Sequence, residues 1–150
     1  MPSLESLLRR REGVRNDVYL DHPNKRPTVG IGHLVTAADK LKVGDTIDDA
    51  RVSAFFKADS AAALSAAKSQ ASKAGIKDSD FVVYLASVNF QLGTNWYKVH
   101  KKTWALILAG NYSGAAAEVK KSRWASQTPD RVKDFRGALL KLTDKPQEKP

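Results

Sequence analysis

Residues Glu12–His33 read E-G-V-R-N-D-V-Y-L-D-H-P-N-K-R-P-T-V-G-I-G-H, and the rest of the chain is organised around them. Glu12 closes a short helical pattern, and Asp21 follows nine positions later, after an alternating run that predicts a strand. Enzymes that hydrolyse a glycosidic bond use two carboxyl groups facing each other across that bond, one protonated and one ionised. A helix end and a strand end so close in sequence can supply such a pair on rigid supports.

The elements that flank the two acids form a small unit. A first helix begins after Ser3 and ends at Gly13, with Leu4, Leu7 and Leu8 on its apolar face. The run Val14–Leu20 alternates and predicts a strand, in which Val14, Asn16, Val18 and Leu20 share a face. Pro23–Pro27 is turn material, and Thr28–Leu34 predicts a second strand that contains two glycines. We therefore expect a small hairpin or meander.

The remainder of the chain predicts helices. A long helix is expected at Asp48–Lys73, and a second one runs to Leu92 from a cap at Ser79 or Asp80. Two short helices are expected at Trp104–Leu108 and Ser113–Lys121. The last helix begins at the start signal Thr128-Pro129-Asp130. The last helix carries an apolar stripe of Val132, Phe135, Leu139 and Leu142. A tail at 144–150 is expected to be disordered because it is short, polar and rich in proline and charge.

Composition limits the classes of protein that fit. The chain has 150 residues, 42% of them apolar, no cysteine and a net charge of +9. Between Lys98 and Lys141 ten Lys and Arg residues face only three acids, an excess of seven positive charges. Such a balance favours polyanions, whether nucleic acid, anionic lipid or an acidic wall polymer. No run reaches the ~18 apolar residues of a membrane helix, and the N-terminus does not fit a signal peptide.

Other chemistries lack their motifs. There is no cysteine nucleophile and no G-x-S-x-G motif around a serine. His22, His33 and His100 do not have zinc-ligand spacing, and Gly30-Ile31-Gly32 lacks the third glycine of a dinucleotide-binding loop. We therefore expect neither a metal nor a cofactor.

Four motifs carry a resemblance to a known family. E-G-x-R-x-x-x-Y-x-D at Glu12–Asp21 and T-x-G-x-G-H at Thr28–His33 resemble the active-site region of the phage-type lysozymes, the muramidases of coliphages and their relatives. V-N-F-Q-L-G-T-N-W at Val88–Trp96 and K-S-R-W-A-S-Q-T-P-D-R at Lys121–Arg131 are similar to motifs of that family's helical lobe. The similarity runs over residues 4–135, and the segment Pro23–Pro27 replaces a shorter, glycine-containing turn of the family.

The resemblance implies an α+β fold that is mainly α. This two-lobed lysozyme fold would be a single domain over residues 1–143, with a small β-sheet lobe at about 12–60 and a larger helical lobe at about 1–11 and 61–143. A cleft between the lobes would hold the substrate.

Catalytic roles follow from the same resemblance. Glu12 matches the general acid, Asp21 the second catalytic carboxylate, and Thr28 a residue that helps hold the attacking water. Leu34 and Phe90 match positions that line the sugar subsites. The family implies inversion at the anomeric carbon.

Five further residues are expected to support the site. Positions 52, 55, 59, 62 and 66 form one helical stripe, on which only Asp59 is not apolar, so it needs a polar partner. The resemblance implies that His33 is that partner, that Gln91 contacts Trp124 beside the cleft, and that Arg131 contacts the catalytic glutamate.

The implied function is hydrolysis of the β-1,4 bond between N-acetylmuramic acid and N-acetylglucosamine in peptidoglycan, which causes bacterial lysis. The enzyme would be a monomer that meets peptidoglycan and the anionic cell envelope but no nucleic acid. It would be made in the host cytoplasm without a signal peptide and act in the periplasm after release by a holin. Two alternatives stay open: a non-catalytic wall-binding module, and a cationic protein that acts on membranes or binds nucleic acid.

Overall fold

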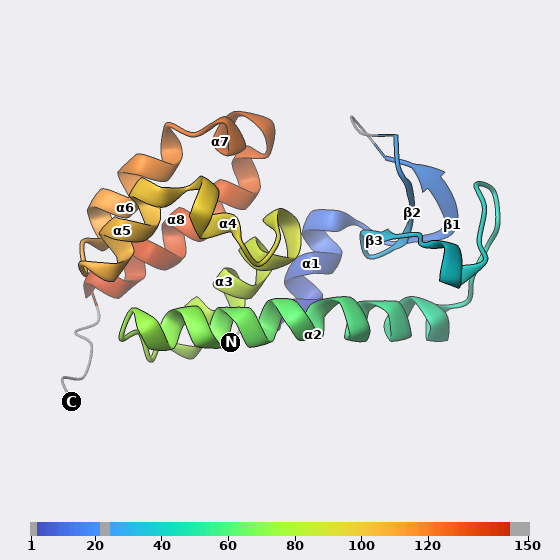
Figure 1. Ribbon diagram of the computed structural model, residues 1–150, viewed down its shortest axis with the longest axis horizontal. Coiled ribbons are helices and arrows are strands. Elements are labelled where there is room, and N and C mark those ends of the chain that lie inside the picture. The colour runs from blue at the N-terminus through green and yellow to red at the C-terminus, as the bar shows by residue number, and fades with distance from the viewer. Residues whose placement is uncertain (1–2, 22–24, 145–150) are drawn as a thin grey trace. The chain divides into compact units, whose positions relative to one another are not determined.

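The computed structural model describes residues 3–21 and 25–144 (Figure 1). Its elements are α1 (Leu4–Glu12), β1 (Arg15–Leu20), β2 (Pro27–Gly30), β3 (His33–Leu34), the 3-10 helix η1 (Ala37–Asp39), α2 (Asp49–Lys73), α3 (Ser79–Leu92), α4 (Trp96–Val99), α5 (Lys101–Leu108), α6 (Tyr112–Lys120), α7 (Arg123–Gln127) and α8 (Pro129–Asp144). A small N-terminal sheet followed by helices confirms the predicted fold class, α+β and mainly α.

The chain divides into two compact units, and the division falls within α2. The sheet unit comprises Glu5–Ala61, and the helical unit begins at Ala62 and also takes in Leu4. The sequence analysis placed residues 1–11 with the later helices, whereas the structure groups α1 from Glu5 onward with the sheet. The single lysozyme domain over residues 1–143 stays a prediction.

The sheet is an antiparallel meander in the order β1-β2-β3. The paired residues are Arg15 with Gly30, Tyr19 with Thr28 and Leu20 with Pro27 between β1 and β2, and Thr28 with Leu34 and Val29 with His33 between β2 and β3. The register is irregular between Arg15 and Tyr19, so β1 bends along its length. The middle strand, β2, therefore brings Thr28 between its two neighbours.

The segment Thr28–Leu34 was predicted as one strand, and this was wrong. The chain reverses within it, so that β2 and β3 pair with each other. Gly30 and Gly32 make this possible, because both have positive φ, 67° and 66°. A residue with a side chain adopts that backbone conformation only at a cost.

The four alternating residues that were expected to share one face of the first strand differ in burial. Val18 is 1% exposed, but Val14 and Leu20 are 38% and 49% exposed. The backbone N–H of Val18 and the side-chain amide of Asn16 instead donate hydrogen bonds to carbonyls of the 45–47 loop, at 2.8 and 3.0 Å. This loop covers the edge of β1 that does not pair with β2, so the polar Asn16 anchors a loop instead of facing a core.

Helix α2 begins where the sequence predicts it. The Asp48 side chain accepts a hydrogen bond from the backbone N–H of Arg51 at 2.8 Å, as a helix cap does. Its buried apolar side chains differ from the predicted stripe and are Val52, Phe56, Ala63, Ala67 and Ala71. Ala62 is exposed, so the stripe that contained Asp59 is not a buried one.

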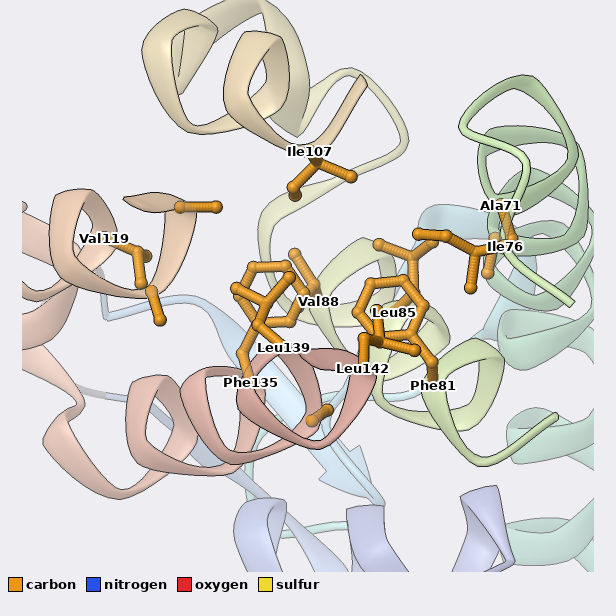
Figure 2. Packing of buried hydrophobic residues seen from close by; sticks show 14 of the residues in the cluster. Ala71, Ile76, Phe81, Leu85, Val88, Ile107, Val119, Phe135, Leu139 and Leu142 are labelled. Atoms are coloured by element: carbon orange, nitrogen blue, oxygen red, sulfur yellow. The ribbon is translucent and has the colours of Figure 1, made fainter. Parts of the chain in front are cut away.

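The core of the helical unit lies around α3 and α8. Phe81, Leu85 and Val88 of α3 and Phe135, Leu139 and Leu142 of α8 are buried in one cluster with side chains of α2, α5 and α6 (Figure 2). The rings of Phe81 and Phe135 lie 6.1 Å apart. Each fully buried side chain of this size contributes roughly 1.5–3 kcal/mol to stability. The predicted apolar stripe of α8, which includes Val132, is confirmed.

Helix ends show where local signals were misread. Asp78, not Ser79 or Asp80, caps α3, and its carboxylate accepts from the backbone N–H of Phe81 at 2.9 Å. The short helices α4 and α7 were not predicted. Helix α8 runs to Asp144, and the rest of the predicted disordered tail, at 145–150, lies outside the described residues. Among the helices of the described chain, none combines the length and apolar character needed to span a membrane.

Candidate active site

A hollow of about 410 Å³ opens in the sheet unit. Its walls are formed by Glu12, Arg15, Tyr19, Leu20, Asp21, Thr28, Gly32 and Leu34. These residues come from the end of α1, from both ends of β1, and from the hairpin that follows. The hollow therefore brings together all three residues predicted to be catalytic and one of the two predicted to bind substrate.

Glu12 stands at the last position of α1, where Gly13 ends the helix with a φ of 74°. An acid at the C-terminal end of a helix lies at the negative end of the helix dipole and does not stabilise the helix. On its other side Gly32 packs against the carboxyl group. A β-carbon built at Gly32 would stand 2.8 Å from Oε2 of Glu12 and 3.1 Å from Cδ. The bare backbone of the β2–β3 turn is thus a wall for the Glu12 carboxyl group.

Asp21 and Thr28 are both bonded to the backbone of Arg26. The Arg26 N–H donates to Oδ1 of Asp21 at 2.8 Å, and the Thr28 hydroxyl donates to the Arg26 carbonyl at 2.9 Å. Thr28 is buried, and its hydroxyl hydrogen is committed to that carbonyl, so toward a water in the hollow its oxygen can only accept. The peptide before β2 therefore orients both side chains. Residues 23 and 24 of the predicted Pro23–Pro27 turn lie outside the described residues.

Arg15 and Tyr19 line the hollow, but the sequence analysis assigned them no role. The Arg15 guanidinium lies 4.2 Å from the centre of the Tyr19 ring and donates to Asp17 at 2.6 Å. Burial raises the pKa of Tyr19, and the negative charges of Glu12 and Asp21 raise it further against the opposing charge of Arg15. The pKa of Tyr19 therefore responds to both acids that line the hollow. Both residues are fixed letters of the motif E-G-x-R-x-x-x-Y-x-D, which was the available signal.

His33 is held between two carboxylates. Its Nδ1 lies 2.7 Å from Oδ2 of Asp59, and its Nε2 lies 2.8 Å from Oδ2 of Asp39. The His33 ring also stacks on Phe55, with centroids 3.9 Å apart and an angle of 8° between the planes. The contact with Asp59 is the one that the resemblance implied, although Asp59 is 30% exposed and not deeply buried. Each ring nitrogen of His33 therefore has a carboxylate oxygen as its hydrogen-bond partner.

Asp39 was not predicted as a partner of His33. It ends the 3-10 helix η1, and its Oδ2 also accepts from the backbone N–H of Thr36 at 2.9 Å, as in a capping box. Desolvation raises the pKa of Asp39, but the hydrogen bonds from Thr36 and His33 outweigh it and hold that pKa below its ordinary value. The two carboxylates meet opposite edges of the His33 ring and do not converge on one point. Within residues 3–21 and 25–144, no group of three or more His, Cys, Asp or Glu is placed to hold a metal ion.

The other predicted site residues belong to the helical unit. Trp124 Nε1 donates to Oε1 of Gln91 at 2.9 Å, and Nε2 of Gln91 donates to the hydroxyl of Thr128 at 3.1 Å. The contact between Gln91 and Trp124 is the one that the resemblance implied, and Thr128 is an addition to it. Phe90 is half-buried on α3 and does not line the hollow around Glu12.

Arg131 lies in the first turns of α8 and is 9% exposed. Its Nη2 donates to the backbone carbonyl and to the hydroxyl of Ser87 on α3, at 3.4 and 3.3 Å. These long bonds connect the two central helices of the unit. A contact of Arg131 with the catalytic glutamate stays a prediction from the resemblance.

Comparisons with known proteins agree with the fold. Residues 9–138 match the family described as "Phage lysozyme". A peptidoglycan hydrolase, gp36 of Pseudomonas phage phiKMV, is 26% identical over 137 residues, which are 91% of this chain but 15% of that protein. Probable T4-type lysozymes 2 and 1 of Dictyostelium discoideum are 29% and 28% identical over 151 residues, and each match covers 86% of this chain and 88% of the relative.

A match that spans most of the chain, on a fold with the expected sheet and helices, establishes its class. The chain belongs to the phage lysozyme family. The predicted enzyme class, a muramidase among the glycoside hydrolases, is confirmed with it. The roles of the individual site residues stay predictions.

Proposed function

We propose that this chain hydrolyses the β-1,4 bond between N-acetylmuramic acid and N-acetylglucosamine in peptidoglycan and thereby lyses bacterial cells. The observation that carries the proposal is the hollow in which Glu12, Asp21 and Thr28 meet. Glycosidases use two carboxyl groups that flank the scissile bond, and this hollow contains such a pair. Membership of the phage lysozyme family supplies the class of polymer.

In the proposed reaction Glu12 donates its proton to the glycosidic oxygen as the bond from that oxygen to the anomeric carbon breaks. Positive charge develops on the sugar ring, and the ionised Asp21 stabilises it. A water molecule adds to the opposite face of the anomeric carbon and inverts its configuration. The two hydrogens of this water point to the Asp21 carboxylate and to the hydroxyl oxygen of Thr28, which both act as acceptors. The hydroxyl hydrogen of Thr28 is donated to the Arg26 carbonyl. The water's proton passes to Asp21, so no metal or cofactor is needed.

The remaining predicted residues have supporting roles in this proposal. Leu34 lines the hollow and offers an apolar surface to a sugar ring, and Phe90 is proposed to serve a neighbouring subsite. His33 and Asp59 brace the strand that follows Gly32. Gln91, Trp124 and Arg131 stabilise the helices of the other unit. We propose a monomer that is made in the cytoplasm, is released by a holin and acts on the wall in the periplasm.

The test is release of reducing ends from purified peptidoglycan by the intact chain. New reducing ends at N-acetylmuramic acid are the expected product, and the anomer that forms first reports inversion or retention. Binding without release would favour a wall-binding module. Killing of cells by a chain that releases nothing would favour a cationic membrane-active protein.

A further inference from the structure

A second hollow, of about 570 Å³, lies in the helical unit and is strongly basic. Its cationic lining residues are Lys120, Lys121, Arg123, Lys133 and Arg136. Its other lining residues are apolar or small and include Ala125, Pro129 and Val132. No acidic residue of the described chain lines it. The hollow shares no lining residue with the one around Glu12.

A smaller hollow of about 170 Å³ adjoins it and extends the basic surface. The two share Lys121 and Ser122, and the smaller one adds Lys101 and Lys102. Its single acidic lining residue, Glu118, lies 3.7 Å from the Lys102 ammonium and 3.9 Å from that of Lys121. We name this surface the basic track: Lys101, Lys102, Lys120, Lys121, Arg123, Lys133 and Arg136. Two joined hollows suit an extended ligand better than a single ion.

The fold gathers these cations from separate segments. Helices α6, α7 and α8 pack on one another, which brings residues 120–123 beside residues 133–136. Arg136 is fixed in place, because its Nε donates to the Ala116 carbonyl at 2.9 Å. Like charges brought together by packing repel each other and destabilise the compact state. Such a surface is therefore not explained by stability, and a polyanionic ligand would relieve the repulsion.

We propose that the basic track binds a phosphodiester-linked glycopolymer of the bacterial envelope. Phosphate groups would meet the lysine and arginine side chains, which are the usual partners of phosphate. The carbon skeleton of the repeating unit would lie over Ala125, Pro129 and Val132. The proposal rests on the proposed function for its choice of an envelope polymer, but it assigns a site separate from that of hydrolysis.

Two other polyanions fit the track less well. Single-stranded nucleic acid is bound by aromatic side chains on which bases stack, and no Phe, Tyr or Trp lines the two hollows among the described residues. A bilayer presents a broad plane of headgroups, whereas the cations here surround concave surfaces. A flexible chain with regularly spaced phosphates can follow both hollows.

Calorimetric titration of the full chain with a short oligo(glycerol phosphate) tests the proposal. The double variant Lys120→Gln/Lys133→Gln removes two charges from the track. Its matched control is Lys68→Gln/Lys141→Gln, which removes two exposed lysines of the same unit that do not line it. We expect about tenfold weaker binding by the track variant and less than about threefold weakening by the control, since each exposed ion pair is weak. The salt dependence of binding should also become shallower only in the track variant.

Several outcomes would overturn the proposal. Equal weakening by the two variants would leave only non-specific attraction. Lysine-dependent binding to vesicles of phosphatidylglycerol and phosphatidylcholine, without binding to the oligomer, would identify a membrane surface. If poly-glutamate binds as tightly as the oligo(glycerol phosphate), the track does not select phosphate groups over carboxylates.

Hydrolysis is measured separately. The track variant should release as many reducing ends as the wild type from peptidoglycan stripped of phosphate polymers, and a loss of release would contradict a separate site. If neither protein releases any, the proposed hydrolysis fails while the titration still decides the track.

Discussion

Gly32 lies so close to Glu12 that a β-carbon at position 32 would stand 2.8 Å from the Glu12 carboxylate oxygen Oε2. We predict that Gly32→Ala destabilises the fold by about 1–2 kcal/mol, because φ at this position is 66°. It should also displace the Glu12 carboxyl group and lower turnover about 100-fold, the effect of a misplacement near 1 Å. Thermal unfolding and reducing-end release by the folded variant measure the two effects separately.

Gly30→Ala is the matched control for this prediction. Gly30 has nearly the same φ, 67°, but a β-carbon there would meet Val52 at an ordinary distance of 3.6 Å. The control should lose similar stability and keep most of its turnover. Equal turnover by the two variants would mean that the contact of Gly32 with Glu12 has no part in catalysis.

The bonds of His33 to Asp59 and Asp39 predict a stability effect. Replacing either aspartate by asparagine should lower the free energy of unfolding by about 1.5–3 kcal/mol, the range for a hydrogen bond to a charged group. The value stays below that of a fully buried pair because the side chains are 11–30% exposed. Turnover by the folded protein should change less than stability. Unchanged thermal melts for both variants would remove the pairing as a source of stability.

Asp39 also predicts how stability depends on pH. Its pKa in the folded chain lies below the ordinary value of 3.8, so its contribution is present above that value and is lost as pH falls through the lower folded pKa. The difference in unfolding free energy between wild type and Asp39→Asn should therefore shrink in acid below about pH 3.8. Denaturant titrations at a series of pH values measure it, and a constant difference would contradict this account.

Local signals predicted those elements that depend on neighbours in the sequence. Helix α2 begins at Asp48 through a hydrogen bond within one turn, from the Arg51 N–H to the Asp48 side chain. Helix α8 begins at Pro129, a residue whose fixed φ suits the first turn of a helix. Glu12, Asp21 and Thr28 were selected through the family resemblance of one short stretch, and the structure places all three in one hollow, while their catalytic roles stay predictions. The hollow's outer members, Arg15 and Tyr19, were present in that stretch but carried no assigned chemistry.

What the sequence did not predict depends on geometry beyond the local pattern. An alternating pattern does not show that the chain reverses at residues 31–32, because the reversal follows from two positive φ angles. The approach of Asp39 to His33 depends on how η1 folds back after β3, and no spacing rule describes it. The buried face of α2 differs from the predicted one, since Phe56 and Ala63 are buried and Phe55 and Ala62 are not.

The positive charge of the chain predicts a salt effect on cells. Electrostatic screening acts over about 8 Å at physiological ionic strength and about 3 Å at 1 M salt. Lysis of whole cells should therefore slow at high salt as association with the anionic envelope weakens. Turnover of short soluble peptidoglycan fragments, which each carry few charges, should change much less. A flat rate of cell lysis across this range would show that the excess charge of the Lys98–Lys141 region does not assist association.

The substitution Glu12→Gln decides the assignment of the general acid. Glutamine keeps the size and polarity of the side chain beside Gly32 but has no acid proton to give to the leaving oxygen. General acids contribute roughly 10²–10⁴-fold to rate, so the variant should lose nearly all release of reducing ends from purified peptidoglycan. It should melt like the wild type and still bind the polymer, since the rest of the hollow is unchanged. The comparison is made at equal concentrations of folded protein.

Glu5→Gln is a suitable control, because it removes one acid from the same helix at an exposed position outside the hollow. It should keep wild-type release, apart from a small loss of stability with its ion pair to Arg9. Equal release by Glu12→Gln and the wild type would exclude Glu12 as the acid and direct attention to Asp21. If neither the wild type nor Glu12→Gln releases reducing ends, but both bind the polymer, the chain has kept the lysozyme fold as a wall-binding module. The hollow around Glu12 then serves recognition alone.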